Sequence, residues 1–66
     1  MTFSGSKVKQ LREAKGMTQA ELAKSAGVTQ SFISDLEGNK KFPSMPTMTK
    51  IAKMLGVTVN DLFEYE

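Results

Sequence analysis

The sequence predicts an all-α fold, a compact bundle of five short helices, from three observations. Threonines that can cap helices recur at Thr18, Thr29 and Thr58. Glycines follow four helical stretches, at positions 16, 27, 38 and 56, where a residue at positive φ closes a last turn. No segment shows the sustained period-two alternation typical of a strand. We therefore expect helices and no strands.

Length and composition limit what this chain can be. The 66 residues predict one domain, 1–66, which at this size buries only ~60% of its unfolded surface. Cysteine and histidine are absent, so disulfides, thiolate metal sites and the commonest general base are excluded. We expect neither an enzyme nor a cofactor. Without a membrane-length apolar run or a signal peptide, we expect a cytoplasmic protein with no membrane partner.

The first two helices are expected on either side of Gly16. The first is expected at about 6–15, with Val8, Leu11 and Ala14 on one face. The second begins after Thr18, where Thr-Gln-Ala-Glu forms a capping box with Glu21.

A third helix is expected between Thr29 and Gly38, joined to the second by a tight turn at Gly27. Ala23, Ala26 and Gly27 are small residues at the positions where two helices crossing at ~90–120° would touch. This pair of helices predicts a helix-turn-helix.

The remaining two helices are read from apolar spacing. One is expected from near Ser44 to Leu55, and the other, at 59–64, contributes Leu62 and Phe63. Residues at helical spacing on the longer one are Met45, Met48, Ile51, Ala52 and Leu55.

Small polar side chains share the outward face of the third helix. These are Gln30, Ser31, Ser34 and Asp35, within its first two turns. Gln can pair with adenine, Ser suits several bases, and Asp can accept from the cytosine amino group. An ordinary solvated helix face is the alternative, but a helix braced by a tight turn favours reading of base edges.

Phosphate contacts are expected on both sides of that face. The second helix presents its N-terminus and Gln19 to one phosphate, and Lys40 and Lys41 can hold another. Asp35 can meet a cytosine or pair with one of those lysines within the protein; both alternatives stay open. Residues 1–53 carry a net charge of +5 and residues 54–66 carry −3, so a polyanion would be steered to one end.

These motifs resemble the XRE family, the Cro and phage-repressor type of helix-turn-helix. The resemblance covers about Val8 to Phe63 and rests on five segments in order: R-x-x-K-G-x-T-Q-x-E-L-A, A-G-V-T, I-S-D-L-E-G-N-K, P-S and I-A-K-M-L-G-V. It implies a five-helix, lambda-repressor-like DNA-binding domain whose third helix enters the major groove. Such domains usually bind as dimers to half-sites ~34 Å apart.

The resemblance also implies roles for individual residues. Gln30, Ser31 and Asp35 would face bases, with Ser34 beside them, while Gln19, Thr29, Lys40 and Lys41 would touch the DNA backbone. Arg12 and Glu37 would form a structural ion pair. Phe42, Phe63 and Tyr65 are the candidates for a dimer interface.

The expected function is transcriptional regulation in a bacterium, phage or mobile element. We expect a repressor that binds double-stranded DNA as a homodimer, with no small-molecule ligand. The alternative is a protein-interaction module on the same fold, of antitoxin or antirepressor type, suggested by Asp35, the modest net charge and the aromatic C-terminal end.

Overall fold

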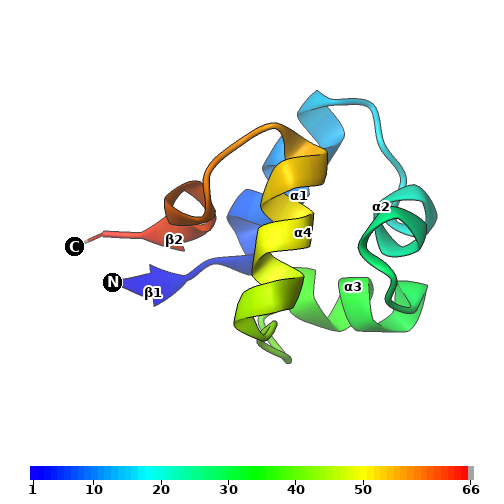
Figure 1. The fold of residues 1–66 in the computed structure, drawn as a ribbon. Helices are drawn as coiled ribbons and strands as arrows, with labels where there is room; N and C mark the ends of the chain where they lie inside the picture. Colours follow the sequence, from blue (N-terminus) through cyan, green and yellow to red (C-terminus); the bar gives the residue numbers. More distant parts are fainter. Residues whose placement is uncertain (66) are drawn as a thin grey trace.

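The computed structural model describes residues 1–65 and is built mainly from four α-helices (Figure 1). They are α1 (Gly5–Ala14), α2 (Gln19–Ala26), α3 (Gln30–Glu37) and α4 (Met45–Leu55). A 3-10 helix, η1 (Val59–Leu62), follows α4. Two short strands, β1 (Thr2–Phe3) and β2 (Phe63–Glu64), complete the described chain. None of the helices in residues 1–65 is long and apolar enough to cross a membrane.

The predicted fifth helix is found only in part, as a 3-10 helix, and the predicted absence of strands is wrong. The segment expected at 59–64 forms only η1 before it extends into β2. That strand pairs antiparallel with β1, with Thr2 opposite Glu64 and Phe3 opposite Phe63. Two-residue strands are too short to leave a period-two pattern, which explains why the sequence did not predict them.

The core lies where the inner faces of the four helices meet η1. Val8, Leu22, Ile33, Leu36, Ile51 and Leu62 are fully buried. Phe3, Ala23, Ala26, Ala52 and Leu55 complete the buried apolar cluster. Two expected members are exposed instead, Ala14 and Met45. On α1 the inner face runs through Val8 and Arg12, which are four residues apart, and this turns Ala14 outward.

Helix starts match the threonine prediction. The Thr18 hydroxyl accepts from the Glu21 N–H at 3.1 Å, and the Glu21 carboxylate accepts from the Thr18 N–H at 2.8 Å. These bonds lower the pKa of Glu21. At η1, the Asp61 carboxylate accepts from both the N–H and the hydroxyl of Thr58 at 3.0 Å, which lowers the pKa of Asp61.

The two ends of the described chain are joined beside α1. The Ser4 N–H donates to the Leu62 carbonyl at 2.8 Å, and the Ser4 hydroxyl donates to Glu64 at 3.1 Å. The Lys7 ammonium donates to the Phe63 carbonyl at 2.7 Å. Figure 1 shows this junction on the opposite side of the molecule from α2.

Candidate nucleic-acid interface

The outward face of α3 carries the polar side chains that the sequence placed there. Gln30, Ser31 and Ser34 are exposed, and Asp35 is half-buried. The opposite face is anchored by Ile33 and Leu36, both fully buried. At the start of the helix the Thr29 hydroxyl accepts from the Phe32 N–H at 3.1 Å. The helix therefore presents short hydrogen-bonding groups from a fixed backbone.

The turn between α2 and α3 depends on backbone conformation at Gly27. Its φ is +71°, and the residue caps the end of α2 in the left-handed region. A Cβ added there would meet nothing within 4 Å, so the expectation of a close approach at Gly27 is wrong. Ala23 and Ala26, in contrast, are buried, as expected for side chains at the helix crossing.

A buried network ties α3 to α1 and α2. The Arg12 guanidinium donates to both carboxylate oxygens of Glu37, from Nε at 2.7 Å and from Nη2 at 3.1 Å. Its Nη1 donates to the Met17 carbonyl at 2.7 Å. The hydrogen bond to Glu37 raises the pKa of Arg12 above its ordinary value, against the opposing effect of burial. The expected structural ion pair is thus present at the end of α3.

Gln19 joins the same network. Its side-chain amide donates to Glu37 Oε1 at 3.0 Å, so the residue expected at a phosphate is also linked to the ion pair. An amide NH2 has two donors, and the second can still serve a phosphate at the start of α2. The sequence alone did not reveal this link, because it joins residues 18 positions apart.

The end of α3 is closed by Asn39, not by Gly38 as predicted. Gly38 has a φ of −87°, whereas Asn39 has a φ of +61°. The Lys40 N–H donates to the Asp35 carbonyl at 2.8 Å, and the Asn39 N–H donates to the Leu36 carbonyl at 3.1 Å. These two bonds form a Schellman motif, in which Asn is the usual substitute for glycine at the left-handed position.

The same turn is held against the start of α1. The Asn39 side-chain oxygen accepts from the Gly5 N–H at 2.9 Å. A Cβ added to Gly5 would overlap the Leu36 carbonyl oxygen and lie 2.9 Å from the Glu37 carbonyl oxygen. Gly5 and Asn39 are therefore positioning residues that the sequence analysis missed. The dipeptide Gly38-Asn39 was the available signal for the second of them, since Asn tolerates positive φ.

Lysines follow this turn immediately. Lys40 and Lys41 are both exposed, and the Lys41 ammonium lies 3.6 Å from Asp35 Oδ2. Of the two alternatives for Asp35, pairing within the protein is therefore seen in this structure. Contact with a base stays a prediction.

Two of the three aromatic residues expected at a dimer interface, Phe42 and Phe63, pack against Phe3. The Phe42 and Phe63 rings each meet the Phe3 ring edge-on, with centroid separations of 6.2 and 5.9 Å. Phe42 is nevertheless 64% exposed, and Tyr65 is 61% exposed. Phe63 is half-buried. A partly exposed aromatic surface thus adjoins the loop that carries the lysines.

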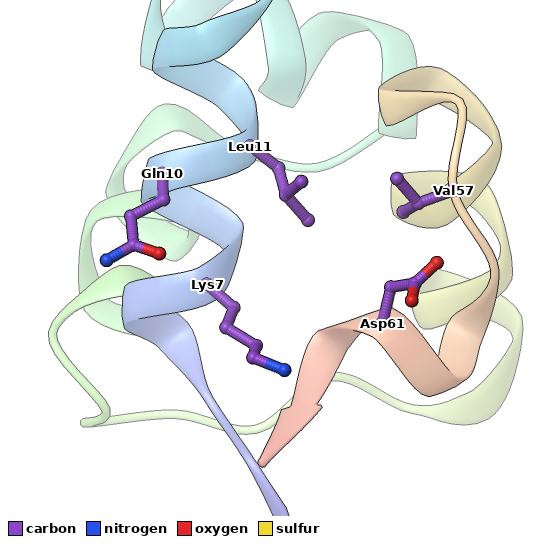
Figure 2. A pocket seen from close by; sticks show the side chains of 5 residues that line it. All are labelled: Lys7, Gln10, Leu11, Val57 and Asp61. Atoms are coloured by element: carbon purple, nitrogen blue, oxygen red, sulfur yellow. The ribbon is translucent and has the colours of Figure 1, made fainter.

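A separate cavity of about 380 Å³ opens between α1 and the chain around η1. It is lined by Lys7, Gln10, Leu11, Val57 and Asp61, and Figure 2 shows Leu11 and Val57 facing each other across it. Its charged groups already have partners in the protein, Lys7 at the Phe63 carbonyl and Asp61 at Thr58. None of these lining residues belongs to α2 or α3, so the cavity is no part of the candidate interface.

Known proteins are similar to this chain in sequence and in fold. The chain is 42% identical over 60 residues to the "Uncharacterized HTH-type transcriptional regulator MJ0272" of Methanocaldococcus jannaschii, covering 91% of each chain. It is 38% identical to the HTH-type transcriptional regulator SinR of Bacillus subtilis, of which it spans just 55%.

Solved structures extend this likeness. The crystal structure of SinR in complex with DNA matches with a TM-score of 0.84 at 38% identity, over 91% of this chain and 97% of that one. The P22 c2 repressor bound to a synthetic operator matches with a TM-score of 0.90 over the whole of both chains. At 23% identity the latter is a likeness of fold alone.

A match to a family model shows to which protein family the chain belongs. The model described as Helix-turn-helix, HTH_3, matches residues 8–62, which is most of the chain. The matched region contains α2, α3 and the network of Arg12 and Glu37 that fixes them. The chain therefore belongs to this helix-turn-helix family, the XRE type whose motifs its sequence carries.

Proposed function

We propose that this chain is a sequence-specific regulator of transcription that binds double-stranded DNA with α3 in the major groove. The observation that carries the proposal is the exposed face of Gln30, Ser31 and Ser34 on a helix whose inner face and C-terminal end are fixed. A rigid helix with short polar groups can bring donors and acceptors to base edges without first being ordered. The DNA complex of the relative SinR supports this use of the fold.

Contacts to the DNA backbone would set the register of α3. We assign them to Gln19 and Thr29 at the helix starts and to Lys40 and Lys41 after the Schellman turn. The lysines are exposed, and the Thr29 hydroxyl, which accepts from the Phe32 N–H, retains its own proton to donate. Phosphate contacts of this kind position a protein without reading sequence.

We further propose that the chain binds as a homodimer on an inverted repeat. The side chains that support this are Phe42 and Tyr65, each exposed, and Phe63, which is half-buried beside Phe3. Large exposed apolar side chains are typical of contact surfaces. A two-fold dimer would place two copies of α3 about one helical turn, ~34 Å, apart along the DNA.

Repression is the mode of regulation that we propose. A protein seated in the major groove excludes other proteins from the same segment, and this needs no further surface or chemistry. We propose no enzymatic activity, because the sequence has neither histidine nor cysteine to activate a nucleophile. Binding to a bacterial or phage operator would place the protein in the cytoplasm with its DNA.

Selection from a random duplex library at near-physiological salt tests the proposal. An enriched inverted repeat is the expected result, and it would identify the operator. If no motif emerges and binding stays weak and salt-limited, the α3 face serves a protein partner instead, as in an antitoxin or antirepressor.

Two variants then separate base reading from backbone contact. Gln30→Ala should reduce discrimination at one or two base pairs by ~1–3 kcal/mol each, with little change on random duplex. Lys40→Gln should weaken binding to the selected and random duplexes alike and reduce the salt slope by about one. Equal losses of both variants on both duplexes would contradict these assignments.

A further inference from the structure

We propose that Lys41 is the counter-ion of Asp35 in the DNA complex, so that its ammonium neutralises the carboxylate of the α3 face within the major groove. The inference deepens the proposed function and rests on it. It assigns the two neighbouring lysines different tasks: Lys40 holds only a phosphate, whereas Lys41 allows a carboxylate to approach DNA.

The backbone, rather than a chance meeting of side chains, brings the two groups together. The Schellman turn bonds the Lys40 N–H to the Asp35 carbonyl at 2.8 Å, which places Lys41 directly after the residue tied to Asp35. Asn39 fixes the same turn to the Gly5 N–H of α1. The Lys41 ammonium lies 3.6 Å from Asp35 Oδ2 as a result.

The neighbouring lysine provides the contrast. Lys40 has the same charge and lies in the same turn, but within residues 1–65 it forms no ion pair. Of these two adjacent lysines, both exposed, only Lys41 pairs with Asp35 within residues 1–65.

Electrostatics gives this pair its importance on DNA. In the protein alone, an ion pair whose side chains are 57% and 32% exposed contributes little to folding. Against DNA the same carboxylate faces a dense array of phosphates with less water to screen it, and it would repel them without a nearby cation.

The chemistry of the two groups permits simultaneous contacts. A carboxylate has two oxygens, so Oδ2 can keep Lys41 while Oδ1 accepts from a cytosine amino group. An ammonium has three donors and can reach a phosphate while it stays beside the carboxylate. The two alternatives for Asp35, base contact and internal pairing, are therefore compatible.

A double-mutant cycle tests the proposal. The variants are Lys41→Gln, Asp35→Asn and their combination, with Lys40→Gln as the matched control in both backgrounds. Affinity for the selected duplex and for a random duplex is measured by fluorescence anisotropy at several salt concentrations. Asp35→Ser supplies a second neutral background, and thermal melting confirms that each variant is folded.

The expected result is a coupling between positions 35 and 41 that position 40 lacks. In the wild-type background Lys41→Gln should weaken binding about tenfold more than Lys40→Gln does, on both duplexes. In the Asp35→Asn background the two losses should agree within about twofold, the usual limit of additivity. Lys41→Arg should preserve binding, since a guanidinium pairs with a carboxylate at least as well as an ammonium.

The outcomes distinguish the counter-ion role of Lys41 from the proposed binding of DNA. Equal losses for Lys41→Gln with and without Asp35 would overturn the counter-ion role and leave the proposed function intact. A wild-type chain that prefers no duplex over random DNA would overturn the proposed function and the inference together.

Discussion

Glu37 accepts hydrogen bonds from Arg12 on α1 and from Gln19 on α2, although it lies at the end of α3. It is only 7% exposed, so each of these donors depends on a carboxylate that water cannot replace. One buried side chain thus sets the position of α3 relative to both of its neighbours.

We predict that Glu37→Ala unfolds this domain or brings it close to unfolding. Removing one partner of a buried ion pair costs ~3–5 kcal/mol, because the other charge stays buried without its acceptor. In a domain of this size each kcal/mol lowers the Tm by ~4–8 °C. Thermal melting followed by circular dichroism is the measurement, with Glu13→Ala, on the exposed side of α1, as control. An unchanged Tm for Glu37→Ala would refute the role.

Substitution of Gly5 and of Gly38 by alanine should affect stability differently. Gly5→Ala should be strongly destabilising, because its Cβ would overlap the backbone of α3 at Leu36. Gly38→Ala should be nearly neutral, since its Cβ would lie 3.5 Å from the nearest carbonyl oxygen and its φ is −87°. Urea unfolding of both variants tests this, and similar midpoints would contradict it.

The Arg12–Glu37 pair was predictable and the Gly5 contact was not. The pair was implied by the family resemblance of the sequence. The crowding at Gly5 arises from carbonyl groups of residues more than thirty positions away, and no local pattern carries that information. Helical spacing placed Gln30, Ser31, Ser34 and Asp35 on one exposed face; the first three are exposed, whereas Asp35 is half-buried.

At the scale of elements, short helices depend on the groups that satisfy their first N–H donors. The carboxylates of Glu21 at α2 and Asp61 at η1 accept hydrogen bonds from the backbone N–H groups of Thr18 and Thr58, respectively. Both carboxylates lie on the surface, so their contribution to the stability of the fold depends on their charge and not on burial.

This gives a pH prediction whose sign follows from the lowered pKa of both carboxylates. A group whose pKa is lower in the folded state adds stability above its unfolded pKa, near 4, and loses it as the pH falls through the folded value. We expect the Tm to fall as the pH drops below about 4. The combined Glu21→Gln and Asp61→Asn variant should show a smaller fall in Tm over the same pH range. Melting from pH 7 to pH 2 tests this; parallel curves would contradict it.

Element starts were easier to predict than element ends. Thr18 and Thr29 cap α2 and α3 through their own side chains, so the signal is local. At the end of α3 either Gly38 or Asn39 could have taken the left-handed conformation, and the bond from Gly5 to the Asn39 side chain favours the second. The fifth helix ends at Leu62, two residues earlier than predicted, because pairing with β1 draws residues 63 and 64 into a strand.

For the molecule as a whole, Phe3 links parts of the chain that are far apart in sequence. Its ring is 8% exposed and lies between the rings of Phe42 and Phe63. Phe3→Ala should therefore destabilise the domain by ~3–5 kcal/mol. Tyr65→Ala, at a side chain that is 61% exposed, is the control. A urea midpoint for Phe3→Ala equal to that of the control would show that β1 is dispensable.

The pairing of Thr2 with Glu64 makes the backbone nearly a closed ring. A short flexible linker between residues 2 and 64 would join the ends of this domain without moving any helix, and a new break at the exposed Lys15–Gly16 would yield a circular permutant of it. Since neither the join nor the break falls within α3, such a permutant would keep the face that carries Gln30, Ser31 and Ser34. The order in which the helices are connected and the surface that they present are thus separable properties of this fold.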